Sequence, residues 1–121
     1  MMAGAQLEKE MAAFQNLQRD FSKVIESRTQ LESQLKENEM VAKEFSLLKP
    51  DATIYKLIGP VLVKQEQGEA VTNVKKRVEY ITGEIKRLEG QIKDLDKKQE
   101  AKKAEVIQLQ QAYQQQMQAN A

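Results

Sequence analysis

Cysteine, histidine and tryptophan are absent from the 121-residue sequence. Without cysteine and histidine, the chain has no thiol nucleophile, no imidazole base, no disulfide and no Cys/His metal or haem site. The five glycines are dispersed and form no phosphate-binding loop. We therefore expect a protein that is not an enzyme and that binds no cofactor and no metal.

Proline and glycine are also scarce, at 2 and 5 residues, and aromatic residues make up 5% of the chain against 31% charged residues. This composition is typical of long helices rather than of a globule with a large enclosed core. No run of about 18 apolar residues occurs, and the first residues lack the basic and apolar regions of a secretory signal. We expect a soluble cytoplasmic protein with no membrane partner.

Neither sign of charge dominates, since 19 Lys and Arg oppose 18 Asp and Glu. A net charge of +1 gives no general attraction to nucleic acid. Basic residues cluster at positions 75–77 and within 97–103, without the interleaved aromatics of a single-strand-binding surface. These clusters, and carboxylates such as Glu37, Glu39 and Glu44, are interpreted as solvated helix faces, and no nucleic-acid partner is expected.

Apolar residues recur in alternating steps of three and four along two long segments, which predicts a coiled-coil seam on each. The first helix is expected over about residues 6–48, ended by Pro50, and the second over about residues 69–118. The predicted seam positions of the first helix are Leu7, Glu10, Phe14, Leu17, Phe21, Val24, Arg28, Leu31, Leu35, Asn38, Ala42 and Phe45. Those of the second are Val71, Val74, Val78, Ile81, Ile85, Leu88, Ile92, Leu95, Gln99, Lys102, Val106, Leu109, Tyr113 and Gln116.

The segment between the helices, about residues 50–67, has a different texture. Two short apolar runs flank Gly59 and Pro60, which is the pattern of a β-hairpin, and Gly59 is expected to adopt a positive φ in its turn. The hairpin residues on either side of that turn are Ile54, Tyr55, Leu57, Ile58, Val61, Leu62 and Val63. An irregular loop with buried apolar residues is the alternative interpretation.

A hairpin between two paired helices makes those helices antiparallel. If Phe45 lies opposite Val71, Phe14 faces Lys102 near the other end of the seam. Gln99 and Lys102 then place polar layers there, and polar layers weaken a seam. We expect the ends away from the hairpin to be looser and partly exposed.

The hairpin is predicted to need partner strands, because an isolated hairpin is marginal in water and both of its edges offer unpaired backbone groups. Ile54 and Ile58 share one face, while Tyr55 and Leu57 share the other, so both faces carry large apolar groups. The prediction is a mainly α chain: a long antiparallel two-helix coiled coil whose central hairpin joins a multi-chain β-barrel. The alternative is that the hairpin folds back on its own helices.

The hairpin and its flanks resemble the β-type subunits of the prefoldin family. The segment IYKLIGPVLVKQEQGEA, residues 54–70, is similar to the family's strand, glycine turn, strand and helix start, and the helices on either side resemble the family's two helices. The resemblance implies a hetero-hexamer of α-type and β-type subunits. It further implies an ATP-independent chaperone that captures unfolded proteins, such as nascent actin and tubulin, and transfers them to a group II cytosolic chaperonin.

Holding an unfolded chain requires accessible apolar groups that adapt to varied partners, as methionine does. The candidate client-binding residues lie near the ends away from the hairpin and are Leu7, Met11, Phe14, Leu109, Tyr113 and Met117. The alternative for Leu7, Phe14 and Leu109 is that they are ordinary seam residues. The alternative for the whole chain is a structural or adaptor coiled-coil protein.

Overall fold

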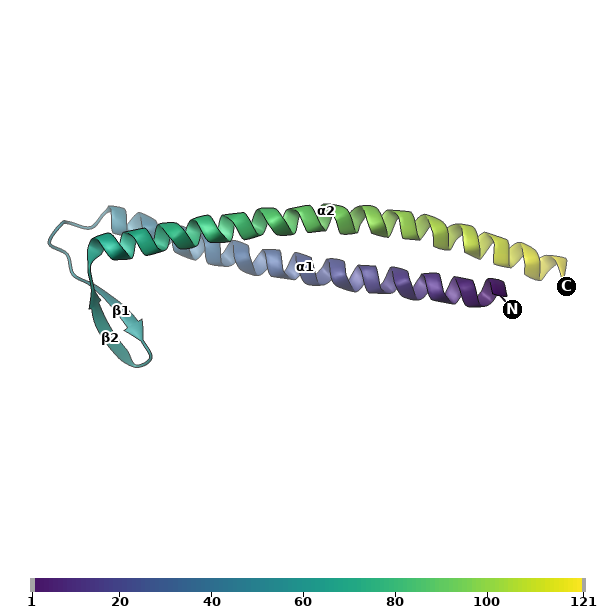
Figure 1. Cartoon of the computed structure of the whole chain (residues 1–121), viewed down its shortest axis with the longest axis horizontal. Helices are drawn as coiled ribbons and strands as arrows, with labels where there is room; N and C mark the ends of the chain where they lie inside the picture. The colour runs from purple at the N-terminus through teal and green to yellow at the C-terminus, as the bar shows by residue number, and fades with distance from the viewer. Residues whose placement is uncertain (1, 121) are drawn as a thin grey trace. The chain divides into compact units, whose positions relative to one another are not determined.

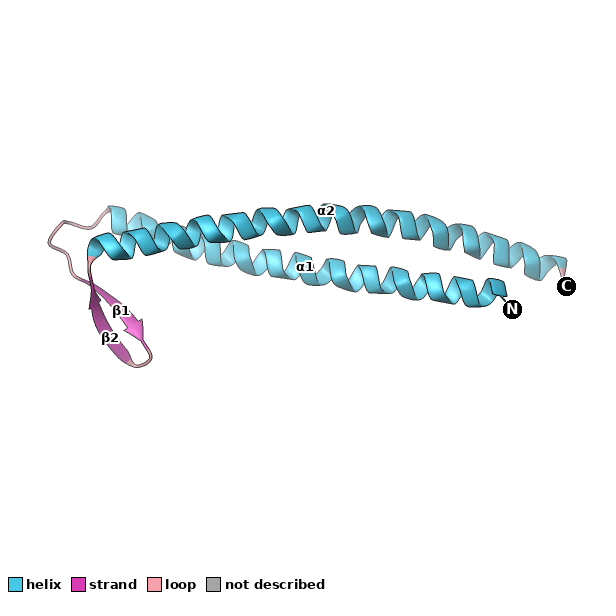
Figure 2. Cartoon of the chain, in the orientation of Figure 1, coloured by secondary structure: helices cyan, strands magenta, loops and turns pink. Residues whose placement is uncertain are grey.

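Two long helices flank a two-stranded hairpin in the computed structural model, which describes residues 2–120 (Figure 1; Figure 2). The elements in chain order are α1 (Met2–Ser46), β1 (Ile54–Ile58), β2 (Val61–Gln65) and α2 (Gln67–Ala119). The predicted order of helix, hairpin and helix is confirmed. Compared with the expected ranges of about 6–48 and 69–118, α1 begins and ends slightly earlier, and α2 is slightly longer at both ends.

The chain divides into two compact parts, and each helix contributes a stretch to both. The hairpin part consists of residues 28–87, and the terminal part consists of the described residues up to 27 together with those from 88 onward. In the hairpin part, Phe45 lines one groove with Ala70, and Leu31 lines another with Ile81. Residue numbers therefore fall along α2 as they rise along α1, so the paired stretches are antiparallel, as predicted.

The seam follows the predicted heptads. All twelve seam positions of α1 are half-buried, and of the fourteen on α2 only Gln116 is exposed. The buried side chains are Ala70, Val74, Ile81 and Ile85 in the hairpin part and Leu88 and Val106 in the terminal part. Fully burying a Val, Leu or Ile side chain stabilises by roughly 1.5–3 kcal/mol. The larger share of this stabilisation belongs to the hairpin part, whose seam is the drier one.

One seam layer of the terminal part is polar and is closed by ion pairs. The Lys102 Nζ donates to Oε2 of Glu10 at 2.6 Å and to Oε2 of Glu105 at 3.1 Å. The side chains of Glu10 and Lys102 are 14% and 25% exposed. The sequence places Phe14 opposite Lys102, but the long lysine side chain reaches the carboxylate one turn away on α1. The pairing offsets the cost of removing both charges from water.

The loop between α1 and β1 begins by tightening the last helical turn. The N–H groups of Leu47 and Leu48 donate to the carbonyls of Glu44 and Phe45 at 3.1 and 3.2 Å. The N–H of Ala52 then donates to the carbonyl of Lys49 at 3.0 Å, which closes a turn with Pro50 at its second position. These turns end α1 at Ser46 and redirect the chain toward β1.

Gln67, the first residue of α2, fastens this loop. Its Nε2 donates to the carbonyl of Lys49 at 2.8 Å and to the carbonyl of Ala52 at 3.0 Å. The two bonds join the segment that precedes β1 to the segment that follows β2. The hairpin is therefore anchored on both sides by one side chain.

The hairpin pairs Ile54 with Gln65 at one end and Ile58 with Val61 at the other. Only Gly59 and Pro60 remain for the loop, and Gly59 has a φ of +57°, as predicted. The proline ring holds the next φ at about −65°. A positive φ followed by a negative one fits a type II′ turn, whose twist matches that of the strands it joins.

Gly59→Val is expected to destabilise the hairpin by about 1–2 kcal/mol, because a β-branched side chain is strained at positive φ. An added Cβ would meet no atom within 4 Å, so the backbone conformation alone carries this cost. Gly59→Asn is the matched control, since asparagine tolerates this region better. Amide hydrogen exchange of the strand residues measures the effect, and unchanged protection in the valine variant would contradict the turn assignment.

Gly90→Ala should act in the opposite direction. Gly90 lies within α2, where an added Cβ also meets no atom within 4 Å, and alanine favours a helix over glycine by about 1 kcal/mol. Chemical unfolding followed by circular dichroism should show a raised midpoint. A lowered midpoint would mean that α2 needs glycine there.

Glu10→Lys and Lys102→Glu should each lower the thermal unfolding midpoint, because each variant places like charges in a half-buried layer. The double variant restores opposite charges across the layer and should recover part of the loss. Circular dichroism of the two single variants and the double variant tests the coupling. Strictly additive losses would show that the pair does not contribute to the seam.

Candidate functional site

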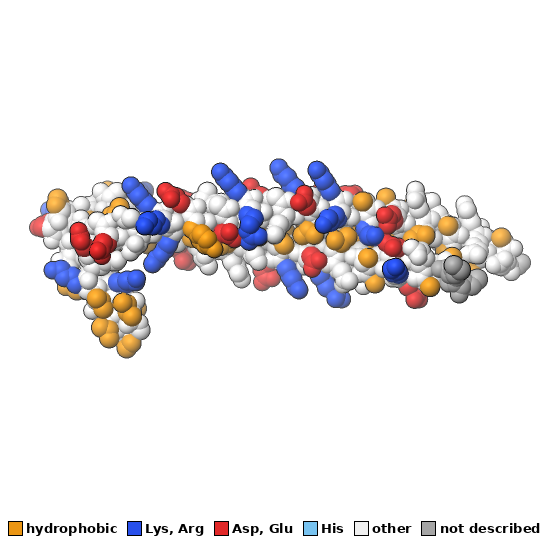
Figure 3. All heavy atoms as spheres, in the orientation of Figure 1, with side chains coloured by type: hydrophobic (Ala, Val, Ile, Leu, Met, Phe, Trp, Pro, Cys, Tyr) orange, Lys and Arg blue, Asp and Glu red, His pale blue; other side chains and the backbone are white. Residues whose placement is uncertain are grey.

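The hairpin presents apolar side chains on both faces. Figure 3 shows hydrophobic side chains gathered over the hairpin, while charged side chains are spread over the helices. The exposed apolar residues of the two strands are Tyr55, Leu57, Ile58, Val61, Leu62 and Val63, and Leu57 is the most exposed of them at 67%. Alternation along the strands puts Ile58, Val61 and Val63 on one face and Tyr55, Leu57 and Leu62 on the other. Gly59 and Pro60 at the tip are exposed as well.

The hairpin meets its own helices along one groove, which Tyr55 and Leu57 also line, but Ile54 is the only apolar strand residue that is half-buried there. Ile54 is half-buried and lines a groove of about 340 Å³ with Val41 and Phe45 of α1 and Val74 of α2. The alternative in which the hairpin folds back on its helices therefore describes the base alone. The other apolar residues of both strands stay exposed within the described chain.

The two strand edges add backbone groups to this apolar surface. The sheet contains β1 and β2 only, so each strand has one unpaired edge within residues 2–120. Unpaired N–H and C=O groups accept further strands, and clustered exposed apolar side chains mark protein-interaction surfaces. Chemically, the hairpin is suited to pairing with strands and apolar side chains of other chains.

The six candidate client-binding residues fall into two groups in the terminal part. Leu7, Phe14, Leu109 and Tyr113 are half-buried in the seam. Met11 and Met117 lie outside the seam and are 39% and 48% exposed. The structure thus separates side chains that pack between α1 and α2 from two methionines that remain accessible.

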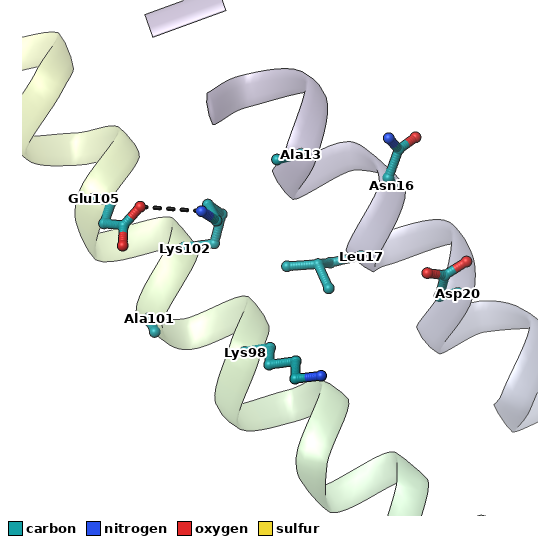
Figure 4. Close-up of a pocket in the computed structure, with 8 residues that line it drawn as sticks. All are labelled: Ala13, Asn16, Leu17, Asp20, Lys98, Ala101, Lys102 and Glu105. Atoms are coloured by element: carbon teal, nitrogen blue, oxygen red, sulfur yellow. Dashed lines mark hydrogen bonds and ion pairs between the residues drawn. The ribbon is translucent and has the colours of Figure 1, made fainter. Parts of the chain in front are cut away.

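A pocket of about 510 Å³ lies between α1 and α2 in the terminal part, beside the polar seam layer (Figure 4). Leu17 projects from α1 toward α2 and, with Ala13 and Ala101, supplies the apolar surface of this pocket. The other lining residues are Asn16, Asp20, Lys98, Lys102 and Glu105. Because these residues carry charges of both signs, the pocket favours no single class of charged ligand.

Hydrogen bonds between charged groups shift the pKa values in this region. The bond from Lys102 lowers the pKa of Glu10, and the same bond raises the pKa of Lys102. In the hairpin part, the bond from Arg87 lowers the pKa of Glu84, whose Oε2 lies 2.8 Å from Arg87 Nη2. In both pairs the shifts favour the charged forms, so each interaction is an ion pair between charged groups.

The sequence predicts the hairpin residues, but it gives no signal for the role of Gln67 or for the exposure of Tyr80. Gln67 resembles the many other glutamines in the chain, and nothing in its spacing signals a bond to the preceding loop. Tyr80 lies off the heptad seam and is 69% exposed. Within residues 2–120, the Asp and Glu side chains form no group that would hold a metal ion, and none of the helices has an apolar stretch that could span a membrane.

The sequence model of the family described as "Prefoldin subunit" matches residues 8–118 of this chain. Prefoldin subunit 6 of Mus musculus is 47% identical over 115 residues, which cover 95% of this chain and 91% of the mouse protein. Prefoldin subunit 6 of Saccharomyces cerevisiae is 45% identical over 98 residues, covering 81% of this chain and 86% of the yeast protein. These relatives confirm the resemblance to the prefoldin family, and both are subunit 6 proteins.

The fold is also that of a known prefoldin structure. The prefoldin β subunit of Thermococcus strain KS-1 superposes with a TM-score of 0.76 at 25% identity, covering 84% of this chain and 89% of the archaeal one. The predicted β-type plan is thereby confirmed. With its exposed hairpin, its antiparallel helices and a family match over nearly its whole length, the chain belongs to the prefoldin family, as a prefoldin chaperone subunit.

Proposed function

We propose that this chain enters a hetero-hexamer of α-type and β-type prefoldin subunits that captures unfolded proteins without ATP and delivers them to a group II chaperonin in the cytoplasm. Nascent actin and tubulin are the clients that the family resemblance suggests. The observation that carries the proposal is the hairpin with two exposed apolar faces and two open edges. Such a surface is costly to leave in water and is stabilised by strands from other chains.

Assembly would assign a different task to each element. Hairpins of several chains would pair edge to edge and close into a barrel, which removes the free edges and buries both apolar faces. The helices would then project from the barrel as separate arms. The sequence has no glycine-rich phosphate loop, which agrees with a cycle that uses no ATP.

Client holding would depend on weak apolar contacts from several arms. Met11 and Met117 are accessible and flexible, and methionine adapts to partners of differing shape. Contacts from separate arms add through effective concentration, so no single arm needs to bind tightly. Leu7, Phe14, Leu109 and Tyr113 would contribute when the terminal part of the seam opens, and otherwise they stabilise the seam.

The double substitution Leu57→Asp and Val63→Asp should abolish the hexamer while leaving the helical circular dichroism signal unchanged. One substitution lies on each hairpin face, and both side chains are exposed within the chain, so the charges oppose burial only in the assembly. Size-exclusion chromatography with light scattering, on the chain coexpressed with its partner subunits, measures the outcome. Met40→Asp, an exposed apolar site on α1 in the hairpin part, is the control. A normal hexamer from the double variant would refute the barrel, and a homodimer of the unaltered chain would favour the adaptor alternative.

The double substitution Met11→Ser and Met117→Ser should reduce client holding several-fold without changing the hexamer. Both side chains are exposed and outside the seam, so their loss removes accessible apolar surface and little packing. The assay is suppression of aggregation of a chemically unfolded protein, at equal hexamer concentration and without nucleotide. Met40→Ser is the matched control, because Met40 is an exposed methionine of the hairpin part. Full suppression by the double variant would remove these methionines from the client site.

A further inference from the structure

A groove in the hairpin part combines an apolar floor with positive charge. It lies between α1 and α2, has a volume of about 420 Å³ and is separate from the hairpin surface itself. Leu31 and the buried Ile81 form its floor, and Tyr80 lies beside them with 69% of its surface exposed. Lys76 and Arg77 line the same groove, and no acidic residue does.

The two cations of the groove are not neutralised by a carboxylate of the described chain. Arg87 is paired with Glu84, Arg28 with Glu32, and Lys102 with Glu10 and Glu105. Lys76 and Arg77 make no ion pair within the described residues 2–120. From the sequence, positions 75–77 are interpreted as a solvated helix face. The structure shows in addition that Lys76 and Arg77 line a groove with an apolar floor.

Tyr80 is also not explained by packing within the chain. It lies off the seam, whereas the other aromatic residues of the helices are half-buried seam residues. Tyrosine and arginine are the residue types that most often dominate binding at protein interfaces. An exposed tyrosine beside an unpaired arginine and an aliphatic floor therefore has the composition of a docking surface.

Charge determines which partner fits. A partner that covered the groove with apolar or basic groups alone would remove Lys76 and Arg77 from water without compensation, at a high cost. A partner that brings carboxylates would pair with both cations while an apolar side chain covers Leu31 and Ile81. We propose that this groove docks a short acidic segment of a partner protein, with a large apolar residue on the floor and carboxylates on Lys76 and Arg77.

The test uses the hexamer and a labelled peptide, acetyl-Glu-Glu-Leu-Phe-Glu-Glu-amide carrying a fluorophore, with binding followed by fluorescence anisotropy. Lys76→Glu combined with Arg77→Glu should weaken binding at least about tenfold, and Tyr80→Ser should weaken it about fivefold. Lys75→Glu combined with Lys86→Glu is the matched control. Both control lysines are exposed residues of α2 in the hairpin part, lie outside the groove and change the net charge equally. The control should stay within about twofold of the unaltered protein.

Three results would overturn the proposal. Equal weakening in the control pair would indicate general attraction to a basic helix. No binding to the unaltered hexamer would exclude the groove as a binding site for acidic segments. Altered subunit stoichiometry in the Lys76→Glu and Arg77→Glu variant would show that a neighbouring subunit occupies the groove, which is continuous with the hairpin base through Arg77. Client holding by that variant should be unchanged, so failure here is distinguishable from failure of the chaperone role.

Discussion

The hairpin has two apolar faces, and the chain has only two helices with which to cover them. Those helices pack their apolar side chains against each other along the seam, so Ile54 is the only apolar strand residue that is half-buried against α1 and α2. A pair of five-residue strands builds no core of its own. The surface from Tyr55 to Val63 is consequently left uncovered within the described chain, and we propose that other chains bury it. In the proposed assembly, this uncovered surface would supply the contacts between subunits.

A seam between two helices gives each residue one neighbouring helix to pack on, so most seam residues are half-buried. Stability then depends on how dry each layer is. Val74 and Ile81 make dry layers in the hairpin part, whereas Glu10 and Lys102 place charge in a layer of the terminal part. A polar layer costs stability but specifies which residues meet. The strongest burial therefore lies in the part that carries the proposed assembly surface, and the weaker seam lies in the part that is proposed to meet varied clients.

The sequence predicted most of the fold because its signals are local. Heptad spacing identified the seam of both helices, and Gly59 with Pro60 predicted the turn, its positive φ and the two apolar faces. What it missed depends on neighbours distant in sequence. The partner of Lys102 is Glu10 because a lysine side chain spans a helical turn, which a facing-layer register does not show. The bonds of Gln67 depend on the path of the preceding loop, and the groove beside Tyr80 needs Leu31 and Ile81 from different helices.

The exposed surfaces of this chain are carried by different side chains, and that separation has a physical consequence. The hairpin faces, the exposed methionines Met11 and Met117, and the groove of Leu31 and Tyr80 share no apolar residue. Substitutions that change what one surface binds therefore leave the packing of the others intact, as distant independent sites do. The exception is Arg77, which lines both the groove and the hairpin base. A partner that drew Arg77 toward its own carboxylate would also change the charge presented to the hairpin base, so any coupling between docking and assembly should pass through this one side chain.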